Sequence, residues 1–169
     1  MNFEEKDIEL GTDGMGIVFF SPETTKDIPI GADFLQTEFT KPADVARHLK
    51  QGDVVGFCTG TGGDFTLKFR EGYPDDEISK EYPVTARLGI DIRDDKLCAI
   101  DLYWTMEWSN ECPPEQTLKI NSGYYHITLC TRCPASGYWG DGQTIYVYLN
   151  RLEEMPQLSW TGVPMLFRD

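Results

Sequence analysis

The sequence predicts an all-β protein, mainly an antiparallel β-sandwich of about eight or nine strands with one short helix. In Val84–Ile92, and again in Cys98–Trp108, hydrophobic residues occupy every second position, the pattern of strands with one buried face. Strands do not alternate with long helices, as parallel α/β folds require, and turn residues interrupt the chain throughout. A closed barrel is the second choice of architecture.

The N-terminal third contains the predicted helix. Residues 1–14 are polar and acidic, so we expect a loose arm or an edge segment there. The apolar run Met15–Phe20 predicts a strand covered on both faces, and residues 34–40 predict a second short strand. Beyond them, Thr40 as N-cap, a proline in the first turn and Gly52 at the end predict the helix.

The rest of the chain predicts three hairpins and one long loop. The paired segments are Asp53–Thr59 with Phe65–Arg70, Val84–Ile92 with Cys98–Trp108, and 123–130 with 145–149. An acidic loop, Glu71–Lys80, precedes the second hairpin, and Thr117–Ile120 is a short strand. The connection Thr131–Gln143 is long for a hairpin and is therefore a candidate functional loop. The tail, Pro156–Asp169, is expected to dock on the body of the protein.

The composition predicts a single soluble domain, residues 1–169. Hydrophobic residues make up 40% and charged residues 25% of the chain, and no apolar stretch is long enough for a membrane helix. The acidic N-terminus does not resemble a secretory signal, so we expect a cytoplasmic protein. The chain has 5 cysteines, an odd number, which we therefore interpret as reduced thiols.

The net charge of −13 argues against nucleic acid or an anionic membrane as partner. Residues 1–111 hold 23 acidic against 11 basic residues, so the negative charge is concentrated in the first two thirds. A field of this sign attracts cationic surfaces and speeds their encounter. Solubility alone is the ordinary explanation of such a charge.

No motif predicts a catalytic centre or a cofactor. Cys130 and Cys133 have the spacing of a zinc knuckle, but a structural zinc site needs four ligands, and only His126 and Cys112 are near in sequence. Packing of the two cysteines at a strand end is the simpler reading, and zinc binding stays open. The glycine-rich segment Gly60–Gly63 leads into a strand, so it fits a turn better than a phosphate loop.

Acidic clusters and aromatic side chains predict a protein-binding surface. Aromatic anchors inside a charged rim suit a tight interface, because aromatics supply buried area at low entropic cost and the rim steers the partner. Solvated turns and cross-strand packing are the alternative explanation. The candidate partner-binding residues are Asp75, Asp76, Glu77, Asp94, Asp95, Tyr103, Glu107, Tyr138 and Trp139.

A family resemblance covers residues 82–131. The alternating strand from Val84, its polar tip, the return strand and then Gly123-Tyr124-Tyr125-His126-Ile127-Thr128-Leu129-Cys130 resemble small bacterial inhibitors related to the competence-nuclease inhibitor, and immunity proteins of polymorphic toxin systems. The resemblance implies a stoichiometric inhibitor that docks on a toxin, commonly a nuclease, and catalyses nothing. The long loop and the extended tail depart from the family, and no functional residue is transferred by a motif.

We therefore expect a cytoplasmic immunity-type protein, without cofactor or enzymatic activity, that neutralises a basic toxin through its acidic surface. A nuclease suits this role, because an enzyme that binds phosphates presents Lys and Arg. The second hypothesis is a ligand- or calcium-binding β-sandwich module that uses loops at one end. A hydrolase built on the carboxylates ranks last, because the sequence shows no catalytic constellation.

Overall fold

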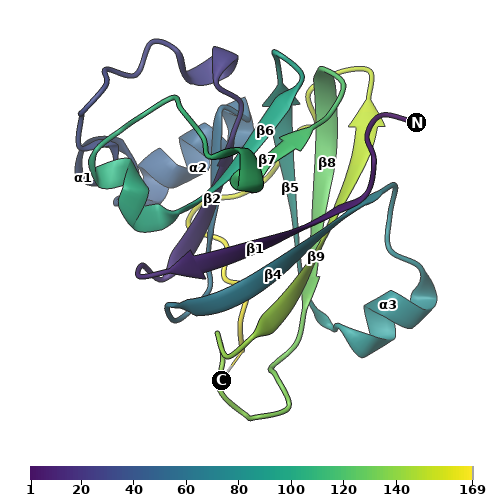
Figure 1. The fold of residues 1–169 in the computed structure, drawn as a ribbon. Coiled ribbons are helices and arrows are strands. Elements are labelled where there is room, and N and C mark those ends of the chain that lie inside the picture. The colour runs from purple at the N-terminus through teal and green to yellow at the C-terminus, as the bar shows by residue number, and fades with distance from the viewer. Residues whose placement is uncertain (169) are drawn as a thin grey trace.

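Nine strands, arranged in two sheets, dominate residues 1–168, the part of the chain that this computed structural model describes (Figure 1). Asp169, the last residue of the predicted tail, lies outside the described residues. The strands are β1 (Lys6–Thr12), β2 (Gly16–Phe20), β3 (Val54–Cys58), β4 (Gly63–Glu71), β5 (Val84–Ile92), β6 (Lys96–Asp101), β7 (Thr117–Lys119), β8 (Gly123–Thr131) and β9 (Gln143–Leu152). The helices are α1 (Phe34–Glu38), α2 (Pro42–Gln51) and α3 (Asp76–Glu81), with 3₁₀ helices η1 (Glu23–Thr25), η2 (Leu102–Met106) and η3 (Pro114–Gln116).

The five-stranded sheet has the order β1-β4-β9-β8-β5. It is mixed, because β4 and β9 run parallel while the other neighbouring pairs are antiparallel. The predicted pairing of 123–130 with 145–149 is confirmed: Ile127 lies opposite Leu149, and Leu129 opposite Val147. The N-terminal residues supply the edge strand β1, in agreement with the expected edge segment.

The four-stranded sheet has the order β3-β2-β6-β7 and is antiparallel throughout. Every residue of β2 is buried, as its continuous apolar sequence predicted. Side chains of the two sheets share one hydrophobic core. The Phe19 ring of β2, for example, lies 5.9 Å from the Phe69 ring of β4 and 5.6 Å from the Phe57 ring of β3, measured between centroids.

Two predicted hairpins are wrong. The chain turns tightly at Asp94 and Asp95, but β5 then pairs with β8 and β6 enters the other sheet. The physical reason is that both edges of β6 are taken by β2 and β7. In the same way β3 pairs with β2, whereas β4 lies between β1 and β9, so the segments around Gly60 do not form a hairpin. The closed barrel is wrong as well, because the strands form two sheets.

The helical content is larger than one helix. The predicted helix is present as α2, which begins after Lys41 and not after Thr40, and ends at Gly52 with φ 72°. The segment 34–40, predicted as a strand, contains α1 at residues 34–38, because the Asp33 side chain accepts a hydrogen bond from the Gln36 amide and caps a helical turn. None of the helices within residues 1–168 has the length and hydrophobicity needed to cross a lipid bilayer.

The tail docks on the body, as predicted. Leu166 is fully buried, and its amide donates to the carbonyl of Cys58 at the end of β3. The indole of Trp160 donates to the carbonyl of Arg87 on β5 at 2.9 Å. The tail therefore contacts both sheets, at the end of β3 and in the middle of β5.

Candidate protein-binding surface

The first acidic cluster begins a short helix and does not lie in a loop. Asp75 is the N-cap of α3, its side chain accepting a hydrogen bond from the Ile78 amide at 2.9 Å. Asp76 and Glu77 occupy the first helical turn, where negative charge is favourable because the N-terminal amides are unpaired. All three are exposed, so they add to the field around α3 while also stabilising it.

The second acidic cluster forms the turn between the two sheets. Asp95 accepts hydrogen bonds from the amide and hydroxyl of Ser122 at 2.8 and 2.7 Å, and these bonds lower the pKa of its carboxyl. Asp94 is exposed and adopts φ 60°. Ser122 precedes β8, whereas the long β8–β9 loop follows its other end, so this turn lies at the opposite end of β8 from Tyr138.

The segment that carries Tyr103 leaves the strand at Asp101 and forms η2. The reason is local: the buried Asp101 side chain accepts a hydrogen bond from the Tyr103 amide at 3.2 Å, which caps the 3₁₀ helix. The prediction that Tyr103 and Glu107 lie on a central strand is therefore wrong, although both are exposed. Two neighbours that strand parity had placed inward, Trp104 and Met106, are 48% and 46% exposed.

The β1–β2 turn packs against η2. Asp101 also accepts hydrogen bonds from the backbone amides of Asp13 and Gly14, at 2.8 and 3.1 Å. Gly14 lies so close to the Tyr103 ring that a Cβ atom there would come within 2.9 Å of it. One carboxylate thus fixes two segments that are far apart in sequence, and the exposed Met15 is held beside them.

The β3–β4 and β8–β9 loops continue this surface. Gly62 approaches the Thr12 carbonyl, and the Asp64 amide donates to the Gly140 carbonyl at 2.7 Å. Gln143, which is buried, accepts a hydrogen bond from the Gly140 amide and donates one to the Thr131 hydroxyl, so the base of the long loop is fixed.

The two predicted aromatic anchors of the long loop differ in exposure. Tyr138 is 74% exposed, whereas Trp139 is partly buried and packs against the core. Trp139 therefore holds the loop to the body, and Tyr138 is the side chain that is free for a partner.

We call these four segments, Asp13–Met15, Thr59–Asp64, Leu102–Glu107 and Cys133–Gln143, the aromatic end; they run from the left side to the bottom of Figure 1. None of them contains Lys or Arg. Their exposed carboxylates are those of Asp13, Asp64, Glu107 and Asp141. Five of the nine exposed large hydrophobic residues belong to the aromatic end: Met15, Tyr103, Trp104, Met106 and Tyr138. This combination is typical of an interface with aromatic anchors.

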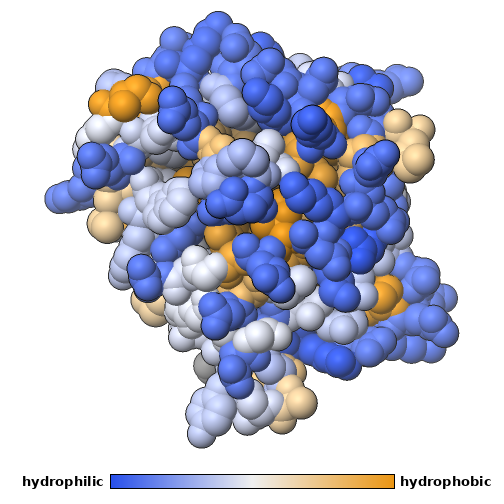
Figure 2. Space-filling view, viewed as in Figure 1, coloured by the Kyte–Doolittle hydropathy of each residue, from blue (hydrophilic) through white to orange (hydrophobic). Residues whose placement is uncertain are grey.

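A separate groove of about 1260 Å³ lies between the N-terminal residues, β7 and the turn at Asp94 and Asp95. Figure 2 shows hydrophobic residues gathered near the centre of this face, surrounded by hydrophilic ones. The groove carries charges of both signs, with Lys6, Lys96 and Lys119 beside Glu4, Glu5 and the two aspartates. Its charge is therefore less complementary to a cationic partner than that of the aromatic end.

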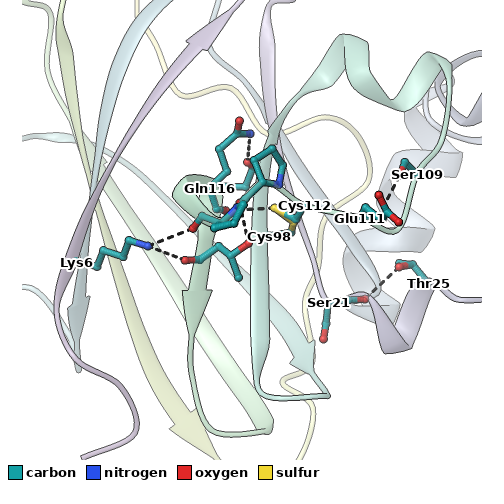
Figure 3. Close-up of a disulfide and its surroundings, with 12 residues drawn as sticks. Lys6, Ser21, Thr25, Cys98, Ser109, Glu111, Cys112 and Gln116 are labelled. Atoms are coloured by element: carbon teal, nitrogen blue, oxygen red, sulfur yellow. Dashed lines mark hydrogen bonds between the residues drawn. A yellow bond between two sulfur atoms is a disulfide. The ribbon is translucent and has the colours of Figure 1, made fainter.

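The cysteines do not behave as five reduced thiols. Cys98 of β6 and Cys112 form a disulfide (Figure 3), so that expectation is wrong for this pair. Burial raises the pKa of the Cys130 thiol, which makes it a poor nucleophile and metal ligand. Within residues 1–168, no group of three or more His, Cys, Asp or Glu side chains is placed to hold a metal ion.

The fold is shared with two solved structures of low sequence identity. One is ComJ from Bacillus subtilis, described as an inhibitor of the DNA degrading activity of NucA, with a TM-score of 0.51 and 11% identity over 90% of this chain and 100% of ComJ. The other is described as crocagin biosynthetic gene J, with a TM-score of 0.53 and 14% identity over 88% of this chain and 98% of the other. No protein-family model matches the sequence, and none of the curated proteins matches it. The resemblance inferred from residues 82–131 is confirmed as a likeness of fold.

Proposed function

We propose that this chain is an immunity-type inhibitor that binds a basic protein, a nuclease above all, and covers its active site with the aromatic end. The observation that carries the proposal is the gathering of five exposed large hydrophobic side chains in segments without Lys or Arg, on a chain of net charge −13. The fold shared with ComJ, a nuclease inhibitor, supports it. In this proposal the two sheets act as the layers of a rigid β-sandwich, and the chain performs no catalysis.

Rigidity is the property that makes the aromatic end suitable for inhibition. An inhibitor gains affinity when its contact residues are ordered before binding, because the entropic cost of fixing them is already met. The Asp101 carboxylate fixes η2 and the β1–β2 turn, and Gln143 fixes the base of the β8–β9 loop. Exposed aromatic and methionine side chains on such a frame can enter recesses of a partner surface.

The acidic candidate residues outside the aromatic end attract the partner at longer range. Asp75, Asp76, Glu77, Asp94 and Asp95 belong to the candidate partner-binding set but lie outside the aromatic end. We assign them to the field that attracts a cationic partner, with Glu107 as the one acidic residue of that set inside the contact area. The expectation of a cytoplasmic protein does not enter the proposal, because the Cys98–Cys112 bond favours an oxidising compartment, where disulfides mainly persist.

The test uses a small basic nuclease, sought first among the products of the reading frames next to that of this chain. The purified chain should form a stoichiometric complex with the nuclease and stop its DNA cleavage. The double variant Trp104→Ala with Met106→Ala should bind at least about 30-fold more weakly, since truncating central anchors of an interface costs about 2 kcal/mol or more. Calorimetry and the cleavage assay measure the two effects.

The matched control is Tyr73→Ala, which removes a side chain of similar exposure, 45%, outside the aromatic end. It should bind like the parent chain, with circular dichroism confirming that both variants are folded. Equal binding by the double variant and the control would show that the aromatic end is not the interface. Unimpaired DNA cleavage in the presence of excess chain would refute the inhibitor itself.

A further inference from the structure

A half-open pocket of about 390 Å³ lies between η2 and the segment that follows it. Its floor is apolar, formed by the buried residues Ile100 and Trp108. The exposed side chains of η2 make up much of its wall. Tyr103, Trp104 and Met106 line it from η2, and Glu107 and Glu111 contribute the acidic side chains. Two carboxylates therefore border an aromatic pocket whose lining contains no cationic residue.

The floor of the pocket is fixed by the core. The Trp108 ring lies 5.0 Å from that of Phe20 and 5.1 Å from that of Phe34, measured between centroids. Its backbone carbonyl accepts a hydrogen bond from the Gly31 amide, and its amide donates to the carbonyl of Ala32. Trp108 is therefore held by side-chain and backbone contacts, so the floor of the pocket is formed without a partner.

The backbone that carries the second carboxylate, that of Glu111, is held by the disulfide. Cys112, next to Glu111, is bonded to Cys98 of β6, and the Glu111 amide donates to the Ser109 hydroxyl at 3.1 Å (Figure 3). The Glu107 amide donates to the Trp104 carbonyl, which closes η2. Both acidic residues consequently extend from backbone that is anchored to the sheet.

We propose that this pocket receives one arginine side chain of the protein partner. A guanidinium is planar and weakly hydrated, so it stacks on the faces of Trp and Tyr while forming paired hydrogen bonds to a carboxylate. Its three-carbon stem suits an apolar floor. A lysine ammonium would gain less, because it is compact, strongly hydrated and unable to form the planar fork.

This inference rests on the proposed inhibitory function and deepens it. A nuclease holds phosphate groups with basic side chains, and arginine is the one best suited to bidentate phosphate contacts. Insertion of such an arginine between Glu107 and Glu111 would remove it from its own substrate site. The pocket would thus supply the chemical basis of inhibition, beyond simple covering of the active site.

The direct test uses three short blocked peptides, Gly-X-Gly, in which X is arginine, lysine or citrulline. Citrulline has the shape of arginine without its charge. The indole N–H resonances of the chain's four tryptophans report the site of binding. The arginine peptide should shift the Trp104 and Trp108 resonances in a saturable manner and leave Trp160, which binds the Arg87 carbonyl, unchanged. Lysine should bind more weakly, and citrulline at least about tenfold more weakly than arginine.

The variant Glu107→Gln with Glu111→Gln should abolish the preference for arginine over citrulline, whereas Asp64→Asn with Asp141→Asn should preserve it. Equal shifts by arginine and citrulline, or no saturable shift at Trp104, would overturn the inference. With the nuclease, the double glutamine variant should inhibit at least tenfold less potently. Full inhibition by that variant would overturn the arginine pocket but leave the inhibitor intact. Arginine binding without any inhibition of the nuclease would overturn the proposed function alone.

Discussion

The buried carboxylate of Asp101 accepts a hydrogen bond from the backbone amide of Gly14 at 3.1 Å, across 87 positions of the sequence. The same carboxylate also accepts from the amides of Asp13 and Tyr103. Charge-assisted bonds of this kind are stronger than neutral ones, and a buried donor that loses its acceptor is costly. Asp101 therefore holds together η2 and the β1–β2 turn, two of the four segments of the aromatic end.

Asp101→Asn should lower the free energy of unfolding by about 1–3 kcal/mol, because it removes the charge and leaves one amide without a good acceptor. It should also speed hydrogen exchange of the Gly14 and Tyr103 amides. Chemical denaturation and exchange measured by NMR check the two effects. Asp141→Asn, an exposed carboxylate of the same surface, is the control and should change stability by less than about 0.5 kcal/mol. Equal stability of the two variants would contradict the role of Asp101.

Gln143 should play the same part for the long loop. Gln143→Ala leaves the Gly140 amide without a partner inside the protein, at a cost of about 1–3 kcal/mol, whereas the Thr131 hydroxyl still donates to the Thr144 carbonyl. We expect faster hydrogen exchange at Gly140 and weaker partner binding through Tyr138. Gln157→Ala, at an exposed position of the tail, is the control for the substitution. Unchanged exchange at Gly140 would show that the loop is fixed by other contacts.

The residues of η2 illustrate where prediction from the sequence stops. The alternation of Val84–Ile92 correctly predicted β5, because one face of that strand packs on the core. This pattern is the same whichever strands lie beside it in the sheet. From Cys98 onward the same period continues past Asp101, so it placed Trp104 and Met106 inward. The hydrogen bond that the Tyr103 amide donates to the Asp101 side chain turns the chain there. The alternation of hydrophobic residues does not indicate this bond.

Strand partners were equally hard to predict. β6 is buried on both faces after its first residue, so its pattern carries no information about which sheet contains it. The disulfide joins a strand residue to a loop residue 14 positions away, a spacing that belongs to no motif. The candidate residues Tyr103, Glu107 and Tyr138 are nevertheless all exposed and belong to segments of the aromatic end. They were selected for the chemistry of their side chains, which the error in conformation does not change.

Electrostatic steering can be separated from contact by charge reversal. Asp94→Lys with Asp95→Lys should slow association with a basic partner several-fold at low salt and leave the dissociation rate unchanged, since these residues lie outside the aromatic end. Glu107→Lys should slow association and speed dissociation as well. Stopped-flow kinetics at two ionic strengths measure both rates. A higher dissociation rate of the variant with both aspartates reversed would mean that the turn lies in the interface. An unchanged association rate would mean that these two charges do not steer the partner.

His126 should make stability depend on pH. Burial, with a smaller contribution from the positive charge of Arg87, lowers the pKa of His126 from its ordinary value of 6.5, and its Nδ1 lies 2.8 Å from the Tyr73 hydroxyl. The unfolded chain therefore binds the proton first as pH falls. The stabilising contribution is complete above pH 6.5 and is lost as the pH falls through the folded-state pKa. His126→Gln should flatten the curve of melting temperature between pH 5 and about pH 8. An imidazole titration by NMR showing a pKa above 6.5 would reverse the expected sign.

The Cys98–Cys112 bond should stabilise both the fold and the arginine pocket. It closes a loop of 14 positions, for which loop-closure entropy gives about 3 kcal/mol. Mass spectrometry after alkylation should find free thiols only at Cys58, Cys130 and Cys133 in the oxidised protein. Cys112→Ser should lower the free energy of unfolding by about that amount and weaken arginine-peptide binding, because Glu111 loses its anchor to β6. Cys133→Ser is the control for thiol removal and should leave both unchanged. Alkylation of all five cysteines without reductant would show that they are reduced, as the sequence predicted. The position of Glu111 would then not depend on a disulfide.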